Sequence, residues 1–315
     1  MNVKEVSKQK ELFTGGHRAC AGCGAAIVAR QVLMAAGPDT VVASATGCLE
    51  VVSTIFPYTA WNVPFLHSAF ENSAATISGV EAMHKSLTKQ GKYNKKLNLI
   101  AFGGDGGTYD IGLQSLSGAL ERGHNILYIC YNNEAYMNTG VQRSGATPKG
   151  ADTTTAPVGK VHKGKEQCRK DLTEIIVAHK IPYVAQAVVG NWRDLTSKVE
   201  KALSMEGPKF INVFQPCRLG WAYKPELTCE IGRLSFETCV WPLYEVRNGL
   251  YKVTKPKEKK PVSEWLKLQG RFRHLAKPEN KPLLDDMQKK IDTDWEFLLK
   301  KEAAFPAPAP APKPA

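Results

Sequence analysis

Short apolar runs alternate with longer amphipathic segments over residues 1–240 of the chain. The apolar runs end in glycine or polar turns, and they predict strands at 39–47, 97–107, 125–133, 182–189 and 209–217. Between these runs, apolar residues at helical spacing predict helices at 72–91, 111–123, 171–180 and 192–205. Apolar strands that alternate with amphipathic helices build a sheet covered on both faces. The pattern therefore predicts a doubly wound, mostly parallel α/β fold.

The pattern changes at about residue 241. Residues 241–302 are basic, proline-punctuated and aromatic, with one predicted helix at 283–302. We expect this segment to be an extension that packs on the α/β domain of residues 1–240 or on a partner, and not a second full domain. The last residues, 303–315, form a Pro/Ala-rich tail that we expect to be disordered or extended.

The composition is that of an ordinary globular protein, because the 315 residues are 43% hydrophobic and 23% charged. The N-terminal residues 1–16 are charged and lack the apolar core of a secretory signal. No apolar run reaches the roughly 18 residues that a membrane span requires. We therefore expect a cytoplasmic protein with no membrane partner.

The net charge of +12 lies to a large extent at the C-terminal end, where residues 252–315 hold 15 Lys and Arg against 9 Asp and Glu. A solvated basic tail and a surface that steers an acidic partner both fit this charge. No nucleic-acid-binding motif and no repeat of basic and aromatic residues accompanies it, so we expect no nucleic-acid partner.

A glycine-rich stretch, FGGDGGTYDIG at 102–112, lies where a predicted strand ends and a predicted helix begins. Backbone N–H groups of such a turn, at the carboxyl end of a parallel strand, form an anion site suited to phosphate. The embedded Asp105 repels phosphate unless a hard cation bridges the two, and Mg²⁺ is the usual choice. Taken alone, this stretch is equally compatible with a structural turn.

A second stretch, YNNEAYMNTG at 131–140, lies at the end of the next predicted strand, from which oxygen ligands can reach the same ion. Gly-Asp-Gly followed, one helix and one strand later, by Asn is similar to the pattern of thiamine diphosphate enzymes. By that resemblance, Asp105, the Asn133 side chain and the Ala135 backbone carbonyl hold Mg²⁺ against the diphosphate.

The eight cysteines do not indicate a disulfide framework in a cytoplasmic chain, which leaves metal binding, catalysis or burial. The Cys20–Cys23 pair in GHRACAGCGAAI fits a redox disulfide, half of a zinc site or part of an iron–sulfur site. Zinc sites usually use two close pairs, and the second pair is missing. Spacing alone does not choose further ligands. Burial explains Cys130, and no role is assigned to Cys168, Cys229 and Cys239.

Together these motifs resemble the β subunit of the 2-oxoacid:ferredoxin oxidoreductases, most closely of the pyruvate:ferredoxin oxidoreductases (pyruvate synthases). The resemblance runs from about residue 10 to about residue 300. The segments that carry it include GHRACAGCGAAI, ATGCLEVV, PYTAWNVPFLHSAFENSAATISGVEA, AFGGDGGTYDIGLQSLSGALERGHNILYICYNNEAYMNTG, QRSGATPKGADTTTAPVGK and WPLYEVRNGLYKVT. It implies a thiamine diphosphate-binding fold.

The resemblance also implies two groups of site residues. The ligands of a [4Fe–4S] cluster near the thiamine are Cys20, Cys23, Cys48 and Cys217. The thiamine diphosphate and its Mg²⁺ are bound by Gly47, Gly104, Asp105, Gly106, Gly107, Thr108, Asn133 and Ala135. Asn138 matches the family asparagine beside the reacting thiazolium and the substrate, and it is the expected catalytic and cofactor-contacting residue.

The implied activity is reversible, thiamine-dependent oxidative decarboxylation of a 2-oxoacid. Coenzyme A accepts the acyl group, and the cluster passes electrons one at a time toward ferredoxin. In this family the glutamate that activates thiamine belongs to the α subunit, and neither Glu50 nor Glu71 matches its motif. We therefore expect half an active site, completed by α, γ and δ subunits. Two roles stay open for His17 and Arg18, which are either solvated at the surface or in contact with the cluster. Two also stay open for His67, which either packs in the fold or contacts the substrate.

Pyruvate is the expected substrate. The nearest alternative is the same chemistry on oxalate, 2-oxoglutarate or a branched-chain 2-oxoacid, because substrate contacts come largely from the partner subunit. An alternative of another class is a non-catalytic iron–sulfur or zinc electron-transfer protein that keeps the fold. That alternative predicts cysteine-bound metal without thiamine diphosphate.

Overall fold

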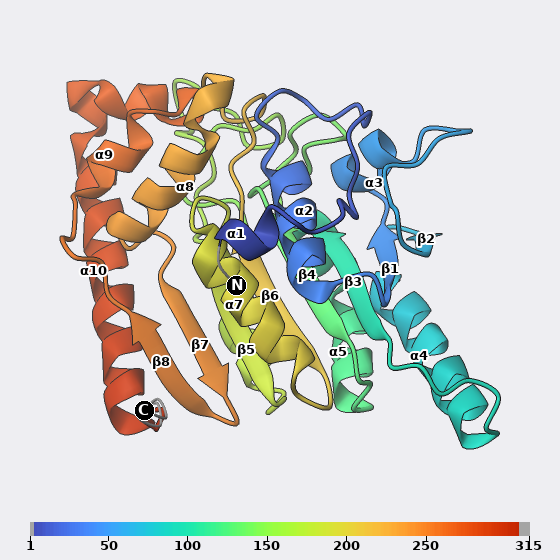
Figure 1. The fold of residues 1–315 in the computed structure, drawn as a ribbon. Helices are drawn as coiled ribbons and strands as arrows, with labels where there is room; N and C mark the ends of the chain where they lie inside the picture. Colours follow the sequence, from blue (N-terminus) through green and yellow to red (C-terminus); the bar gives the residue numbers. More distant parts are fainter. Residues whose placement is uncertain (1–2, 309–315) are drawn as a thin grey trace.

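The computed structural model describes residues 3–308 and is organised around a single sheet of eight strands (Figure 1). Its strand order is β2-β1-β3-β4-β6-β5-β7-β8. The first six strands in this order run parallel to one another. Strand β7 runs antiparallel to its neighbour β5, and β8 runs antiparallel to β7. The parallel strands are β1 (Thr40–Ala45), β2 (Phe65–Ser68), β3 (Asn98–Gly104), β4 (Leu127–Asn132), β5 (Tyr183–Val188) and β6 (Lys209–Phe214).

Helices cover both faces of the sheet. One face packs against α2 (Gly24–Ala36) and α7 (Trp192–Leu203). The other face packs against α4 (Ser73–Lys89), α5 (Leu113–Glu121), α6 (Leu172–Val177) and α10 (Lys281–Ala304). Side chains of a strand point alternately to the two faces, so Ile100 and Phe102 of β3 join the first core, whereas Leu99 and Ala101 join the second. The prediction of a doubly wound, mostly parallel sheet is confirmed.

The remaining short elements lie around this frame. They are α1 (Val3–Val6), α3 (Cys48–Ser53), the π-helical turn η1 (Gly106–Asp110), the 3₁₀ turn η2 (Pro225–Leu227), α8 (Thr228–Glu237), α9 (Val262–Leu266) and the 3₁₀ turns η3 (Gly270–Ala276) and η4 (Pro278–Asn280). Between residues 138 and 165 the described chain forms a long loop with only isolated bridges. None of the helices in the described part combines the length and hydropathy that crossing a bilayer demands.

The segment that follows residue 241 contributes to the sheet itself. Strands β7 (Leu243–Arg247) and β8 (Leu250–Thr254) form a hairpin, and β7 pairs with β5. Helix α10 then packs on this side of the sheet through Trp295 and Leu298. Of the predicted tail at 303–315, residues 309–315 lie outside the described part. Phe305 and Ala307 form backbone hydrogen bonds with Tyr251 of β8.

The hairpin of β7 and β8 was not predicted, even though its signal is local. The segment LYEVRNGLYKVT carries Asn-Gly between alternating apolar residues, which is the strongest short-range pattern for a hairpin. Asn248 and Gly249 adopt the φ values of +50° and +82° that a two-residue turn of this kind requires. The prediction of an extension at residues 241–302 was based on their average composition, which is basic and rich in proline. The local Asn-Gly turn determines the structure of this part of the segment instead.

The parallel strands place all of their carboxyl ends at one edge of the sheet. From β1 the chain crosses to β2 on one side and later to β3 on the other, so the strand order reverses direction between β1 and β3. Ligands of open α/β sheets bind at such a switch point, beyond the strand ends. A ligand site is therefore expected among the residues that follow β1, β3 and the strands next to them.

We predict that α10 is an integral part of the core. Trp295→Ala removes a buried indole and should lower the free energy of unfolding by about 3 kcal/mol. Phe297→Ala lies on the same helix, but Phe297 is 60% exposed, and this variant should change that free energy by less than about 1 kcal/mol. Denaturant unfolding followed by circular dichroism measures both values. Equal effects would mean that α10 does not pack on the sheet in solution.

Candidate active site

The predicted site residues follow four neighbouring strands of the sheet. Cys48 comes after β1, Asp105 after β3, Asn133 after β4 and Cys217 after β6. Because the carboxyl ends of parallel strands meet at one edge, residues that are far apart in sequence come together. Helix formation starts directly at Asp105, whose backbone is already helical, so β3 ends at Gly104 and not at residue 107 as the apolar pattern predicts.

A cavity of about 160 Å³ opens beyond these strand ends. Eight of the predicted cofactor-binding residues line it, namely Gly47, Gly104, Asp105, Gly106, Gly107, Asn133, Ala135 and Asn138. Cys48 and Tyr131 complete the wall near β1 and β4. Asn138 is exposed, and Thr108 is buried with its hydroxyl donating a 2.6 Å hydrogen bond to the Gly104 carbonyl. The side chain of Thr108 therefore braces the turn from within.

The glycines of this cavity are required by close packing. A Cβ at Gly106 would lie 2.3 Å from the ring of Tyr136, and a Cβ at Gly47 would lie 2.9 Å from the Tyr131 hydroxyl. Such distances leave no room for a side chain without displacement of the neighbouring ring. The missing side chains also leave backbone N–H groups of the turn accessible to an anion. The turn is thus built for a ligand that approaches the backbone closely.

Asp105 is a buried carboxylate that the chain supports with neutral groups. Ser144 Oγ donates to Asp105 Oδ2 at 2.5 Å, and the Asn133 N–H donates to Oδ1 at 3.2 Å. Burial raises the pKa of Asp105 to about 7, although both hydrogen bonds lower it. A cation bound beside Asp105 would offset the burial penalty and keep the carboxylate ionised.

The side chain of Asn133 brings together the three predicted Mg²⁺ ligands. One terminal atom of its amide lies 2.9 Å from Asp105 Oδ1 and 2.8 Å from the Ala135 carbonyl oxygen. If that atom is nitrogen, it donates to both oxygens. In that orientation the amide oxygen accepts from Gln215 Nε2 at 3.1 Å. If the atom is oxygen, it faces two acceptor oxygens, and a divalent cation would stabilise such a group. Neighbouring ligand oxygens of an octahedral Mg²⁺ site with bonds of about 2.0–2.1 Å lie about 2.9 Å apart. The residues present therefore fit Mg²⁺.

Tyr131 provides a donor without a partner. Its hydroxyl is buried, forms no hydrogen bond within the described chain and borders the cavity between Gly47 and Gly104. Burial raises the pKa of Tyr131 well above its usual value, so the hydroxyl keeps its proton and can donate. A buried unpaired donor is costly, and an acceptor group on a ligand would satisfy it.

The four predicted cluster ligands lie around the same strand ends. Cys20 is exposed, and Cys23, Cys48 and Cys217 are partly buried. Burial raises the pKa of the Cys48 thiol to about 12, and the neighbouring thiols of Cys217, Cys23 and Cys20 contribute to this rise. A bound metal would reverse this balance, because its positive charge favours the thiolate form.

Small residues allow the loop that carries Cys20 and Cys23 to contact the segment after β6. Gly22 has a φ of +73°, and a Cβ there would lie 2.4 Å from the Pro225 carbonyl oxygen. A Cβ at Gly24 would lie 2.6 Å from Gln215 Oε1. The glycines of CAGCG therefore hold this loop against the segment that contains Cys217.

All eight cysteines are free thiols. Within the part of the chain that the structure describes, no three His, Cys, Asp or Glu side chains gather around one point as a single metal ion requires. A zinc ion draws all of its ligands to one atom, whereas each thiolate of an iron–sulfur cube binds a different iron. Cys130 is fully buried in the core, as predicted from its apolar surroundings.

The histidines left open by the sequence lie close to the site but do not line the cavity. His67 Nε2 is 2.7 Å from Thr46 Oγ1, and His67 Nδ1 is 3.6 Å from Glu50 Oε1. His17 stacks on Phe13 at 5.2 Å between ring centroids. Among the described residues that line the cavity, Asp105 is the only acidic one, since neither Glu50 nor Glu71 reaches it.

Several supporting residues were not predicted from the sequence. Ser144 supports Asp105, Tyr136 covers the glycine turn, and Trp221 Nε1 donates to the Asn133 carbonyl at 2.9 Å. Ser144 and Tyr136 lie in the connection between β4 and α6, and Trp221 lies in the segment after β6. A single sequence gives no sign of such contacts, although QRSGATPKG, the segment that contains Ser144, is one of those that carry the resemblance.

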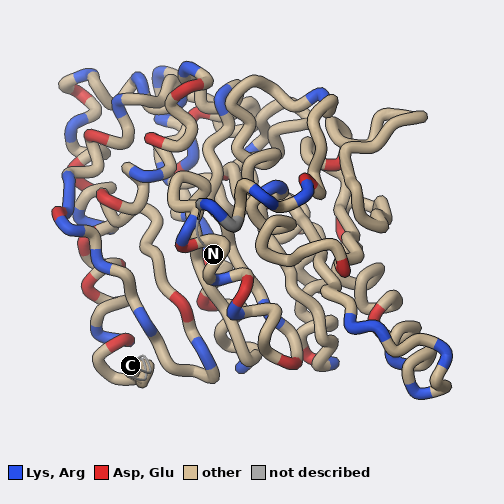
Figure 2. Tube along the Cα trace, viewed as in Figure 1, with Lys and Arg blue, Asp and Glu red and all other residues tan. Residues whose placement is uncertain are grey.

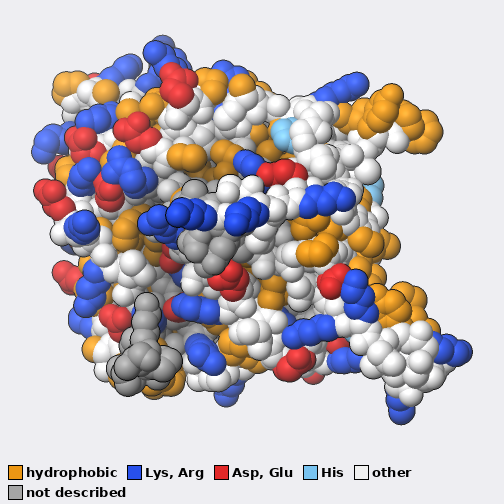
Figure 3. Space-filling view, in the orientation of Figure 1, with side chains coloured by type: hydrophobic (Ala, Val, Ile, Leu, Met, Phe, Trp, Pro, Cys, Tyr) orange, Lys and Arg blue, Asp and Glu red, His pale blue; other side chains and the backbone are white. Residues whose placement is uncertain are grey.

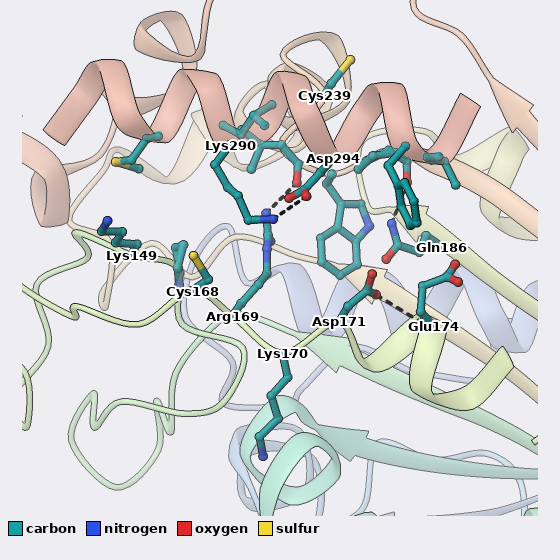
Figure 4. Close-up of a pocket in the computed structure, with 18 of the residues that line it drawn as sticks. Lys149, Cys168, Arg169, Lys170, Asp171, Glu174, Gln186, Cys239, Lys290 and Asp294 are labelled. Carbon is teal, nitrogen blue, oxygen red and sulfur yellow. Dashed lines mark hydrogen bonds and ion pairs between the residues drawn. The ribbon is translucent and has the colours of Figure 1, made fainter. Parts of the chain in front are cut away.

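A second cavity, of about 370 Å³, lies between the sheet, α6 and α10 (Figure 4). Its lining includes Lys149, Arg169, Lys290 and Asp294, and none of the predicted site residues borders it. Its basic side chains are paired with acidic ones, for example Lys149 with Asp286 and Lys170 with Asp110. It is separate from the chemistry of the strand ends.

Comparison with known families gives a match to "Thiamine pyrophosphate enzyme, C-terminal TPP binding domain" over residues 45–213. This range contains the glycine turn and the Asn133 loop. Among curated proteins, "Pyruvate synthase subunit PorB" of Methanocaldococcus jannaschii is 57% identical over 92% of this chain and 97% of its own length. The protein of the same name from Thermotoga maritima is 54% identical over 95% of this chain and 96% of its own.

Other relatives widen the range of substrates in the comparison. "Ketoisovalerate oxidoreductase subunit VorB" of Pyrococcus abyssi is 45% identical over 97% of this chain and 100% of its own length. Among solved structures, a 2-oxoglutarate:ferredoxin oxidoreductase from Magnetococcus marinus matches with a TM-score of 0.55 at 20% identity. The match covers 67% of this chain and 69% of that one. At this identity the similarity concerns the fold.

We predict that Gly106 tolerates no side chain. Gly106→Ala pushes a methyl group into the ring of Tyr136 and should destabilise the protein by about 1–3 kcal/mol. Gly79→Ala is a matched control, because Gly79 lies on α4 with nothing within 4 Å of an added Cβ. That change should stabilise the protein by about 0.5–1 kcal/mol. Thermal unfolding compares the two, and equal shifts would contradict the close packing at the turn.

Proposed function

The chain belongs to the family of pyruvate synthase subunit PorB within the thiamine pyrophosphate enzymes, and we propose that it is the catalytic β subunit of a pyruvate:ferredoxin oxidoreductase. The observation that carries this proposal is that one amide atom of Asn133 lies 2.9 Å from Asp105 Oδ1 and 2.8 Å from the Ala135 carbonyl oxygen, beside a glycine turn. Those three groups would hold Mg²⁺, and backbone N–H groups from Gly106 to Thr108 would bind the diphosphate.

When bound, thiamine diphosphate supplies the electron sink that decarboxylation of a 2-oxoacid requires. The residues of this chain would bind and orient the cofactor and exclude water from it. Tyr131 lies where its hydroxyl can donate to an acceptor on the ligand, and Tyr136 covers the glycine turn. Asn138 lines the mouth of the cavity, where its amide can contact the 2-oxoacid.

We propose further that Cys20, Cys23, Cys48 and Cys217 would hold a [4Fe–4S] cluster, which when bound would supply a one-electron acceptor next to the cofactor site. Cys48 lines the cavity next to Gly47, so a cluster bound there would lie directly beside the cofactor. The thiols of Cys20 and Cys23 contribute to the raised pKa of both Cys48 and Cys217, which supports the proximity of the four residues. Ferredoxin would be the electron acceptor and coenzyme A the acyl acceptor.

The proposal requires partner subunits of the α, γ and δ types. Asp105 is the only acidic residue among the described ones that line the cavity, and Mg²⁺ would occupy it, so an activating glutamate would have to come from the α subunit. The surface near the cavity supports a partner. Residues 51–70 contain no Asp, Glu, Lys or Arg, and within them Phe56 is 93% and Tyr58 is 77% exposed. This loop projects between α3 and β2, without charge in Figure 2 and with hydrophobic side chains in Figure 3.

Pyruvate is the proposed substrate because several relatives at 46–57% identity are pyruvate synthase subunits. A branched-chain 2-oxoacid is the second candidate, because the VorB relative is 45% identical over its full length. The purified complex should release CO₂ and reduce a viologen dye with coenzyme A and pyruvate faster than with 2-oxoisovalerate, 2-oxoglutarate or oxalate. No CO₂ release from pyruvate would refute this substrate.

The division of labour predicts opposite defects for two variants of the complex. Asp105→Ala should abolish retention of thiamine diphosphate and leave the iron content and cluster absorbance intact. Cys48→Ser should impair viologen reduction and lower iron content while the thiamine content stays unchanged. Cys168→Ser is the matched control, because Cys168 is an exposed free thiol outside the four, and it should change neither.

Analysis of thiamine, Mg, Fe and Zn in these complexes also tests the alternative of another class. A non-catalytic electron-transfer or zinc protein would contain cysteine-bound metal without thiamine diphosphate. Zinc in place of iron in anaerobically purified complex would refute the cluster, and a wild-type complex without thiamine diphosphate affinity would refute the catalytic assignment.

A further inference from the structure

Glu134 stands between two of the candidate Mg²⁺ ligands in an unusual backbone conformation. It separates Asn133 from Ala135, has a φ of +65° and is fully buried. A left-handed conformation in a residue other than glycine costs about 1–3 kcal/mol and persists only where surrounding contacts enforce it. This conformation decides how the Ala135 carbonyl is oriented relative to the Asn133 side chain.

The backbone N–H, the carbonyl and both carboxylate oxygens of Glu134 each have a hydrogen-bond partner. Its N–H donates to Asn132 Oδ1 at 2.9 Å, and its carbonyl accepts from Thr147 Oγ1 at 2.5 Å. Its carboxylate accepts from two arginines, at 2.8 Å from Arg169 and 2.6 Å from Arg271. The residue is thus fixed from both the backbone and the side chain.

The two arginines come from distant segments. Arg169 lies in the loop before α6, at the wall of the larger cavity in Figure 4, and also donates to the Val240 carbonyl at 2.6 Å. Arg271 belongs to η3 in the C-terminal segment, and its side chain is only 3% exposed. The C-terminal segment therefore reaches the loop of the candidate Mg²⁺ site through one buried guanidinium.

Arg271 also contacts a tryptophan that joins two parts of the site. Its guanidinium carbon lies 3.6 Å above the centre of the Trp221 ring. The indole Nε1 of Trp221 donates to the Asn133 carbonyl at 2.9 Å, and the backbone N–H of Trp221 donates to the Cys217 carbonyl at 2.9 Å. One side chain thus supports the Asn133–Ala135 loop twice, through Glu134 and through Trp221.

The burial of this group makes a merely stabilising role a poor explanation. Desolvation of a buried ion pair costs about as much as the attraction returns, and apolar replacements of similar volume are often as stable. The same contacts are well suited to orienting the Asn133–Ala135 loop. Residues that hold metal ligands in place commonly control metal affinity without touching the metal.

We propose that Arg271, acting through Glu134 and Trp221, is a positioning residue that orients Asn133 and Ala135 for Mg²⁺ and so sets the affinity for Mg²⁺ and thiamine diphosphate. The inference rests on the proposed function, because it assigns Mg²⁺ to these oxygens. It makes the C-terminal segment part of the cofactor site, although no described residue of that segment lines the cavity.

The test measures binding and not activity. The complex is freed of Mg²⁺ and cofactor with EDTA, and equilibrium dialysis then gives the apparent Kd for thiamine diphosphate over a series of Mg²⁺ concentrations. Arg271→Met should raise that Kd about 10–100-fold at low Mg²⁺, and high Mg²⁺ should restore binding. Arg271→Lys keeps the charge but not the planar fork and should give an intermediate Kd.

Arg273→Met is the matched control, because Arg273 lies on the same 3₁₀ turn but is exposed, and its Kd should equal that of the wild type. Glu134→Gln should raise the Kd as much as Arg271→Met does. The double variant should raise it no further than either single variant, because each change already breaks the same Arg271–Glu134 contact. If Arg271→Met does not fold, Arg271→Lys and Glu134→Gln carry the test.

A lowered thermal midpoint with a wild-type Kd in the folded Arg271 variants would overturn the inference, and so would a raised Kd that high Mg²⁺ fails to restore. Failure of the wild-type complex itself to bind thiamine diphosphate would instead overturn the proposed function. The two failures are therefore distinguishable in one series of dialysis measurements.

Discussion

A buried carboxylate without a positive partner is the constraint around which this site is arranged. Asp105 lies at the end of a central strand, and no Lys, Arg or His of the described chain forms an ion pair with it. Ser144 and the Asn133 N–H support it with neutral hydrogen bonds. Ionisation of such a group is unfavourable until a cation arrives. The Asn133 amide and the Ala135 carbonyl oxygen lie beside this carboxylate, 2.8 Å apart.

The next carboxylate along this edge is treated in the opposite way. Glu134, close to Asp105 and equally buried, has two arginines against it. The chain thus neutralises one carboxylate with its own side chains and gives the other no cationic partner among the described residues. This contrast separates a structural anion from a ligand more clearly than burial does, because both groups are buried to the same extent. A guanidinium group beside Asp105 would compete with any cation for that carboxylate.

Local pattern in the sequence was sufficient for strands β1 and β3 to β6 and for the residues that directly follow them, whereas the short edge strand β2 was not predicted. Apolar strands followed by glycine or asparagine predicted Asp105 and Asn133 at one edge, since the carboxyl ends of parallel strands converge. The cysteine ligands beyond the Cys-x-x-Cys pair were assigned by resemblance to a family, because spacing had not selected them. Ser144, Glu134 and Arg271 were missed. Their roles arise from contacts between loops, which a single sequence does not encode in any regular spacing.

The arrangement also explains why one chain would hold both a cofactor and an electron carrier. Gly47 and Cys48 are consecutive, and both line the cavity. The proposed cluster ligand and the proposed cofactor contact therefore share one turn after β1. Any shift of that turn would change the distance from electron donor to acceptor and the cofactor contacts at once. The Tyr131 hydroxyl, against which Gly47 packs too closely for a side chain, limits such a shift. Rigidity at this turn, more than any single ligand, is what would keep electron transfer matched to the chemistry beside it.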